Sequence, residues 1–268
     1  MFLTERWVLP DLQSVMRWSR IRNDQGIKVT LDILGEYSRR EEEFQHSVDE
    51  YMRTIKHVAD ERLDAAISVK ITSLGYLLDR ESCLRNMLEI CREANNSGIG
   101  FEIDMEGRSM VDFSLNAART FSENGHRVTI ALQAYLNRTA MDIKSMIEKG
   151  IRVRLVKGAY AGDLRDFEEI QNRFIGYARL LSESGNEFAL GTHDPQIISW
   201  AVAELDRAKS KLELGMLKGL SDTTKLDLAK KGWKIAEYVP FGSNATAYIQ
   251  RRLEYLQALK AQGRSPAP

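Results

Sequence analysis

Two adjacent arginines and a tyrosine near the end of the chain have a spacing that could bind an anion. A helix through this run would place Tyr248, Arg251 and Arg252 on one face, because residues three and four apart are neighbours there. Two guanidinium groups held side by side repel each other, so a pair directed into a cleft suggests an anionic ligand. A carboxylate matches the planar donor fork of arginine. The pair taken alone also fits an exposed basic patch, because charged residues are mostly solvated.

Other polar residues that could take part in chemistry stand where short apolar runs end. Lys70 interrupts such a run, and burying an unpaired ammonium group is costly. Arg154 lies inside another run, where a salt bridge explains it as well as a functional role does. Asp104 fits both a functional carboxylate and a helix cap. The full set at these positions is Asp32, Glu36, Lys70, Asp104, Glu106, Gln133, Arg154, Lys157, Thr192, His193, Asp194, Glu237 and Tyr238.

Two of these positions carry a local pattern of their own. In the run 191–195, Asp194 is placed to cap a helix and Pro195 to occupy its first turn, so His193 stands just before a helix. A structural histidine and a functional one fit that place equally well. Lys157 precedes a glycine, a combination that could hold a phosphate but is a weak signal by itself.

Several classes of site and function are not expected. The 38 basic and 38 acidic side chains give a formal net charge of +0, which argues against general nucleic-acid binding. No spacing of His, Cys, Asp and Glu matches a zinc or EF-hand site, so we expect no metal. Neither a GxGxxG nor a Walker A motif occurs, so a nucleotide cofactor would be held outside a Rossmann fold.

Cysteine usage and the N-terminus indicate a cytoplasmic protein. If residues 82–96 are helical, Cys83 and Cys91 lie about 12 Å apart, which is too far for a disulfide. The N-terminus lacks the apolar run of a signal peptide, and no run reaches the length that spans a bilayer. Peripheral contact with the inner face of a membrane is left open.

Eight units of a short β-rich run followed by a helical pattern organise the chain. The predicted strands are 27–34, 66–71, 100–105, 127–133, 151–156, 188–192, 212–217 and 234–239. The predicted helices are 39–62, 80–96, 108–123, 140–149, 165–184, 194–208, 221–231 and 244–262. This alternation favours the α/β class and a closed (β/α)8 barrel, in which the active site lies at the C-terminal ends of the strands.

We expect one catalytic barrel domain, because no linker or change in composition divides the chain. It covers residues 27–262 and follows an N-terminal helical segment, residues 1–26. In that segment an amphipathic helix over 9–18 could close the N-terminal end of the barrel. Residues 263–268 are predicted to be a disordered tail.

Six motifs, in this order along the chain, resemble those of the flavin-dependent proline dehydrogenases. The resemblance spans about residues 27–257, and each motif falls at a predicted strand end or on the last helix. The motifs are Ser68-Val69-Lys70, Ile103-Asp104-Met105-Glu106, Leu132-Gln133-Ala134-Tyr135, Arg154-Leu155-Val156-Lys157-Gly158-Ala159-Tyr160, Thr192-His193-Asp194 and, in two linked parts, Tyr238-Val239-Pro240-Phe241-Gly242 with Tyr248-Ile249-Gln250-Arg251-Arg252.

The resemblance implies a distorted (β/α)8 TIM barrel whose last helix lies over the C-terminal ends of the strands. It implies FAD as the cofactor and L-proline as the substrate. The substrate-binding residues would be Lys70, Tyr238, Tyr248, Arg251 and Arg252, and the catalytic residues Lys70, Asp104, Arg154 and Tyr238. The residues that hold FAD would be Gln133, Arg154, Lys157, Gly158, Ala159, Thr192 and His193.

The implied reaction moves a hydride from C5 of proline to N5 of the flavin and gives Δ1-pyrroline-5-carboxylate, the first step of proline catabolism. Asp104 would orient the tyrosine and lysine side of the pocket. By the same resemblance, a membrane quinone would accept the electrons, although another acceptor and an oligomeric state are left open.

Two alternatives stay open at this point. A Schiff-base lyase or aldolase could use Lys70 or Lys157, because a desolvated lysine at a strand end can become a nucleophile. A non-catalytic binding subunit is suggested by Gly215, which stands where the family commonly has a glutamine.

Overall fold

Eight parallel strands form a closed barrel in the computed structural model, which describes residues 6–268. Each strand pairs with the next along the chain, and the last pairs with the first, so the sheet has no free edge. Every predicted strand is present, with small differences at the ends. The strands are β1 Ile27–Ile33, β2 Ala65–Val69, β3 Gly100–Ile103, β4 Thr129–Gln133, β5 Arg152–Val156, β6 Phe188–Gly191, β7 Leu212–Leu217 and β8 Lys234–Phe241.

Helices connect the strands, as the sequence predicts for a (β/α)8 barrel. They are α2 Leu12–Asp24, α3 Glu41–Asp60, α4 Arg80–Asn96, α5 Val111–Glu123, α6 Thr139–Glu148, α7 Phe167–Glu183, α8 Pro195–Glu204, α9 Asp222–Lys230 and α10 Thr246–Ala261. Short 3-10 turns lie at η1 Ile71–Ser73, η2 Arg108–Met110 and η3 Asp206–Ala208. None of the helices within residues 6–268 combines the length and apolar character needed to cross a bilayer.

The spacing of apolar residues explains why these segments are helical and which face they bury. In α3 the residues of one face recur three or four positions apart and are all buried against the barrel: Phe44, Val48, Tyr51, Ile55 and Val58. At the start of α8, the side chain of Asp194 accepts a hydrogen bond from the backbone N of Gln196 at 3.0 Å, and Pro195 occupies the first turn. The prediction for this helix start is therefore confirmed.

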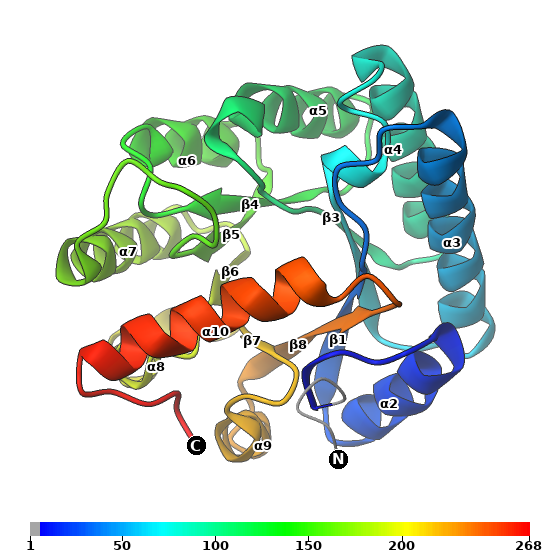
Figure 1. The fold of residues 1–268 in the computed structure, drawn as a ribbon. Coiled ribbons are helices and arrows are strands. Elements are labelled where there is room, and N and C mark those ends of the chain that lie inside the picture. Colours follow the sequence, from blue (N-terminus) through cyan, green and yellow to red (C-terminus); the bar gives the residue numbers. More distant parts are fainter. Residues whose placement is uncertain (1–5) are drawn as a thin grey trace.

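The last helix, α10, leaves the outer ring and crosses the mouth of the barrel, as the family resemblance implies (Figure 1). Its place in the ring, beside β8 and β1, is taken by α2 (Figure 1). The helix predicted over 9–18 thus begins later, at Leu12, and continues to Asp24. It covers the outside of the barrel between α9 and α3, so the prediction that it closes the barrel's N-terminal end is wrong.

A buried group of charges fixes α2 and α9 to the outer face of β8. The carboxylate of Glu237 is fully buried and accepts a hydrogen bond from the Trp18 indole at 2.6 Å. Its other oxygen lies 2.8 Å from Nη2 of Arg22 and contacts Nζ of Lys225. Lys225 is itself fully buried and also lies 2.9 Å from Asp222. Because a buried carboxylate needs such partners, this group sets where both helices dock.

The C-terminal segment 263–268, predicted to be disordered, is packed against the barrel in the structure. The backbone N of Ala267 donates a hydrogen bond to the carbonyl of His193 at 3.1 Å. The backbone N of Thr224, in the first turn of α9, donates to the oxygen of Pro268 at 2.7 Å. The segment's position at a terminus suggested disorder, but these contacts with segments distant in the sequence hold residues 263–268 against the barrel.

Replacing Lys225 by methionine should destabilise the protein by about 3 kcal/mol, because it removes one partner of a buried ion pair. Arg22 remains beside Glu237 and limits the loss. Urea unfolding of wild type and variant measures the difference. Lys230→Met changes an exposed lysine on the same helix and should cost less than about 0.5 kcal/mol. Equal destabilisation by the two changes would contradict the role given to Lys225.

Candidate functional site

One cavity of about 510 Å³ lies at the C-terminal ends of the strands, beneath α10. It gathers all thirteen residues to which the family resemblance gives a catalytic, substrate-binding or FAD-holding role, although they come from six strand ends and the last helix. These residues are Lys70, Asp104, Gln133, Arg154, Lys157, Gly158, Ala159, Thr192, His193, Tyr238, Tyr248, Arg251 and Arg252. The structure therefore brings together every residue that the family resemblance assigns to the site. Of the other polar residues noted at strand ends, Asp32 lines the cavity, Glu36, Glu106 and Asp194 do not, and Glu237 faces the outer helices.

Tyr238 stands at the centre of a hydrogen-bonded group of charges in this cavity. Its hydroxyl donates to Oδ2 of Asp104 at 3.0 Å and accepts from Nζ of Lys70 at 3.4 Å. Lys70 also donates to Oδ1 of Asp32, which is completely buried, and lies 3.7 Å from Asp104. Asp104 thus touches both the tyrosine and the lysine, as an orienting carboxylate would.

Arg154 contacts the same group of side chains through Asp104 and Tyr238. Its Nη2 lies 2.9 Å from Oδ1 of Asp104, and its Nε lies 2.8 Å from Oε1 of the buried Glu102. The guanidinium carbon lies 5.3 Å from the centre of the Tyr238 ring, within reach of a cation–π contact. Arg154 both forms salt bridges and lines the cavity, so a structural role and a functional role are compatible for this residue.

The surroundings of these groups fix their protonation. Burial alone would lower the pKa of Lys70, but Asp32 and Asp104 outweigh it and hold that pKa above its usual value. Burial would raise the pKa of Asp104, but Arg154 and Lys70 hold it below its usual value. Burial and two nearby carboxylates raise the pKa of Tyr238 well above 10. At neutral pH the lysine is therefore a cation, the aspartate an anion and the tyrosine a neutral phenol.

Arg252, on α10, is buried without a carboxylate. It is 3% exposed, and its Nη1 donates to the hydroxyl of Tyr248 at 3.0 Å. Its Nη2 donates to the carbonyl of Lys218, and its guanidinium carbon lies 4.7 Å from the Trp7 ring centre. In the part of the chain that the structure describes, no Asp or Glu oxygen lies within ion-pair distance of it. Burial lowers its pKa, the direction expected for a cation that needs an anionic partner.

Arg251 is the neighbour of Arg252 but has a different environment. Both of its terminal nitrogens donate to the carboxylate of Glu36, one of them at 3.0 Å. The hydroxyl of Tyr160 donates to the same carboxylate at 3.3 Å, and its ring centre lies 4.8 Å from the guanidinium carbon. The two arginines are therefore not equivalent, because Arg251 already has a carboxylate partner. The contact between Arg251 and Glu36 also joins α10 to the loop after β1.

The side of the cavity formed by β4 to β6 carries an unsatisfied polar atom. Nε2 of Gln133 donates to the carbonyls of Met105 and Glu106, at 3.3 and 3.1 Å. Its Oε1 is buried and has no hydrogen-bond partner among the residues that the structure describes. A buried amide oxygen in that state needs a hydrogen-bond donor, which a ligand or an ordered water can supply. On the same side, Nζ of Lys157 lies 2.7 Å from Asp194, although burial lowers the lysine's pKa.

Gly158 is required by its neighbour Tyr135. Its φ of +130° lies in the region that favours glycine, and a Cβ there would stand 1.7 Å from a ring carbon of Tyr135. The hydroxyl of Tyr135 in turn accepts a hydrogen bond from the backbone N of Tyr160 at 3.0 Å. Any side chain at position 158 would displace this ring from the cavity wall.

His193 is a neutral histidine with one nitrogen committed to the backbone. Its Nε2 accepts a hydrogen bond from the backbone N of Leu217 at 2.7 Å. Burial, helped by Arg252 and Lys225, lowers its pKa well below the usual value. A ligand could therefore meet only the other ring nitrogen or the ring itself. Its neighbour Thr192 accepts from the backbone N of Asp194 at 3.1 Å.

Gly215 does not disturb the charged group around Tyr238. It pairs in register with Gly191 of β6, and a Cβ at position 215 would meet only ordinary contacts at 3.7 Å. The two glycines leave an open stretch of cavity floor. A Cβ would therefore fit at position 215, where the family resemblance implies a glutamine, and glycine at this position does not block the cavity.

Several residues of the site were not selected from the sequence. Asp32 and Glu36 were noted at a strand end and Tyr160 within a motif, but none was given a role, and Glu102 and Tyr255 were not considered. A charge inside an apolar run was a usable signal for Asp32, as it was for Lys70. No local signal marks Glu36 as the partner of Arg251, because the two are 215 positions apart.

Comparison with known proteins gives a consistent result. The family model described as proline dehydrogenase matches residues 15–256. Proline dehydrogenase 1 of Bacillus subtilis subsp. natto is 33% identical over 256 residues, which is 92% of this chain and 85% of that protein. Proline dehydrogenase 2 of Bacillus subtilis strain 168 is 33% identical over 250 residues, covering 91% and 82%.

The fold is also similar to that of a solved structure. A crystal structure of proline utilization A (PutA) from Bdellovibrio bacteriovorus, inactivated by N-propargylglycine, superposes with a TM-score of 0.85 at 21% identity. The match covers 93% of this chain but only 32% of that one, so this chain spans about a third of that PutA. At this identity the likeness shows the shared barrel fold.

A buried carboxyl near the site should make stability depend on pH. Glu106 is 1% exposed and accepts hydrogen bonds from the backbone N and the hydroxyl of Thr72. Burial raises its pKa from 4.5 to about 7. The folded state therefore holds the proton more tightly than the unfolded chain, and the unfolding free energy falls as pH rises from about 4.5 to about 7.

Glu106→Gln should remove the part of the unfolding free energy that depends on the protonation of this carboxyl. Across this pH window the unfolding free energy of the variant minus that of wild type should rise by up to about 3 kcal/mol. Urea unfolding at several pH values measures the difference. Glu123→Gln, which changes an exposed carboxylate, serves as the control. A difference that stays constant with pH would contradict the assigned shift.

Proposed function

The chain belongs to the proline dehydrogenase family, and on that premise we propose that the cavity beneath α10 is where its substrate, L-proline, is bound and oxidised. The protein is an oxidoreductase that carries out the first step of proline catabolism. The observation that supports the placement most strongly is Arg252, a buried guanidinium whose contacts in the described chain are all neutral. A substrate carboxylate supplies the charge that this group lacks.

The pose follows from where the cations and rings lie. We place the proline carboxylate between Arg252 and Lys70, with Tyr238 and Tyr248 beside the ring, because all four line one cavity. Charge-assisted hydrogen bonds to a carboxylate contribute about 1.5–3 kcal/mol each. Arg251 is already paired with Glu36, so it could contact the substrate only by sharing or giving up that carboxylate.

The same charges act on the substrate's amine, which must be neutral when the hydride leaves. Lys70 and Arg252 are cations in a buried site and lower the pKa of a nearby ammonium group. Lys70 keeps its own proton because Asp32 and Asp104 hold its pKa high. Tyr238 stays protonated and donates to Asp104. The chain's residues therefore bind, orient and deprotonate the amine by charge, without a dedicated base.

Flavin chemistry is a property of this family, and we propose FAD as the flavin. When bound, the flavin accepts the hydride that leaves C5 of proline. The buried, unpartnered Oε1 of Gln133 fits a ring that presents an N–H donor. Arg154 supplies fixed positive charge to the same cavity, which favours negative charge on a reduced ring. The proposed FAD-holding set is Gln133, Arg154, Lys157, Gly158, Ala159, Thr192 and His193, which all line the cavity.

The two alternative functions find less support. A Schiff-base lysine must lose its proton, yet the pKa of Lys70 is raised. Lys157 has a lowered pKa, but its ammonium group is paired with Asp194 at 2.7 Å. A binding subunit was suggested by Gly215 alone, whereas the four residues proposed for catalysis line one cavity, which favours an enzyme. A quinone acceptor, membrane contact and oligomer formation stay predictions from the family resemblance.

A visible spectrum tests this function. Purified protein reconstituted with FAD should show oxidised-flavin absorbance, and anaerobic L-proline should bleach it. D-proline, which presents the same groups with the opposite hand, is the matched control and should bleach it much more slowly. Protein that takes up FAD but is not reduced by L-proline would contradict the proposed reaction, and protein that cannot take up FAD would contradict the cofactor.

A further inference from the structure

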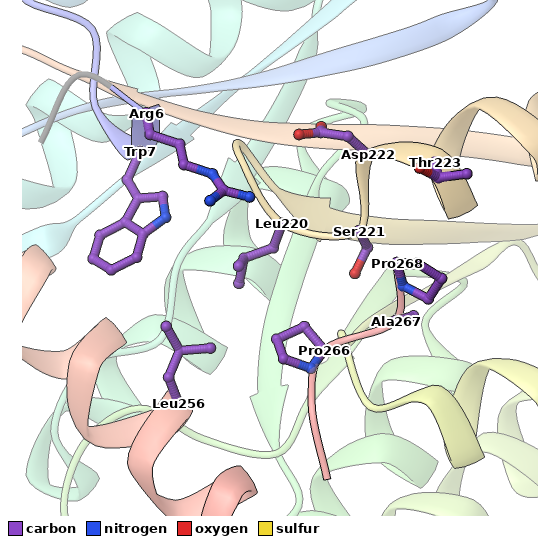
Figure 2. Close-up of a pocket in the computed structure, with 10 residues that line it drawn as sticks. All are labelled: Arg6, Trp7, Leu220, Ser221, Asp222, Thr223, Leu256, Pro266, Ala267 and Pro268. Atoms are coloured by element: carbon purple, nitrogen blue, oxygen red, sulfur yellow. The ribbon is translucent and has the colours of Figure 1, made fainter. Parts of the chain in front are cut away.

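A second cavity, of about 420 Å³, lies outside the proposed proline site (Figure 2). It is enclosed by Arg6 and Trp7, the turn before α9, one side chain of α10 and the C-terminal segment (Figure 2). Among the described residues, none lines both this cavity and the larger one. The second cavity is therefore a separate site that the proposed reaction does not use.

Within residues 6–268, two buried polar groups on its wall have no hydrogen-bond partner. Trp7 is 5% exposed and its indole Nε1–H is unpaired, and Ser221 is 5% exposed with an unpaired hydroxyl. Ser221 precedes α9, but its side chain does not cap the helix, and its φ of +55° is uncommon for a serine. Leaving such a group unsatisfied costs about 1–3 kcal/mol. Both groups can donate a hydrogen bond to an oxygen atom.

Charge around the cavity favours an anion. The guanidinium of Arg6 extends over the cavity (Figure 2), and its Nε donates to the carbonyl of Gly219 at 3.0 Å. Asp222 is the acidic residue on this wall, but it already lies 2.6 Å from Arg22 and 2.9 Å from Lys225. The N-terminus of α9 adds a partial positive charge. In its first turn, the amide and the hydroxyl of Thr224 both donate to the oxygen of Pro268, which also lines the cavity, so a ligand would rely on Arg6, Ser221 and Trp7 and not on these two donors.

The remaining wall is apolar. Leu220, Leu256, Pro266 and the Trp7 ring face the space between Arg6 and Ser221 (Figure 2). A free phosphate would leave this surface uncovered, whereas an uncharged apolar molecule would leave the donors unpaired. We propose that this cavity binds a small organic carboxylate with an apolar body, held by Arg6, Ser221 and the Trp7 indole N–H.

Trp7 connects this cavity to Arg252. Its ring centre lies 4.7 Å from the guanidinium carbon of Arg252. Lys218 links the same two segments, because its carbonyl accepts from Arg252 and its Nζ donates to the carbonyl of Arg6 at 2.8 Å. An anion in the second cavity would repel a carboxylate held by Arg252. The binding itself does not depend on the proposed function, whereas this coupling to proline does, and it is reciprocal.

Binding is tested on the whole chain reconstituted with FAD and labelled with ¹⁵N-tryptophan, with benzoate as the probe. Saturable movement of the Trp7 indole resonance is expected, and Trp7→Phe identifies that resonance. Benzamide, the neutral counterpart, should bind at least tenfold more weakly. Arg6→Gln should weaken benzoate binding roughly tenfold, whereas Arg17→Gln on the exposed face of α2 should not. Ser221→Gly, which tolerates the backbone conformation, should weaken it less.

Three results would overturn the proposal. These are no movement at high benzoate concentration, equal binding of benzamide, and binding that Arg252→Met abolishes while Arg6→Gln does not, because that pattern places benzoate in the larger cavity. For the coupling, benzoate should raise the proline KM in wild type, and the effect should be lost in Arg6→Gln. An effect that persists in Arg6→Gln is competition at the proline site and would contradict the coupling.

Discussion

A buried guanidinium without a carboxylate is the constraint on which the rest of this site depends. A charge removed from water must find an opposite charge or strong hydrogen bonds. Lys70 meets Asp32, Arg154 meets Glu102 and Asp104, Lys157 meets Asp194, and Arg251 meets Glu36. Arg252 has a phenol, a carbonyl and an indole ring instead. A negatively charged substrate supplies the missing partner of Arg252. The same contact that binds the substrate therefore also orients it beneath α10.

The barrel makes this arrangement available by moving one helix. In a regular (β/α)8 barrel the last helix packs outside the sheet, and the strand ends stay open to solvent. Here α10 covers the strand ends, and α2 fills the vacant place against β8 and β1 (Figure 1). The fully buried Glu237 fixes that exchange, because Trp18 and Arg22 of α2 and Lys225 of α9 all meet its carboxylate. A structural ion group outside the barrel thus supports a functional one at its mouth.

Much of this could be predicted because the signals are local. The strands and helices follow from the spacing of apolar residues. A charged residue inside an apolar run, such as Lys70, indicates a buried and partnered group, because burying an unpaired charge is costly. The pair Arg251–Glu36, the place of α2 and the packed tail could not be predicted, because each depends on segments far apart in the chain. Motif order identified the family, but it could not separate the roles of Arg251 and Arg252, since only the fold shows which one already has an anion.

The most direct measurement compares L-proline with L-prolinamide, which lacks the negative charge, in wild type and in Arg252→Met. The ratio of the two kcat/KM values isolates the interaction with the carboxylate, because effects common to both substrates cancel. The account predicts that the preference for proline falls roughly 10- to 150-fold in Arg252→Met and is unchanged in Arg207→Met, a surface control. If Arg252→Met lowers both kcat/KM values by the same factor, Arg252 does not meet the carboxylate, and the proposed site is wrong.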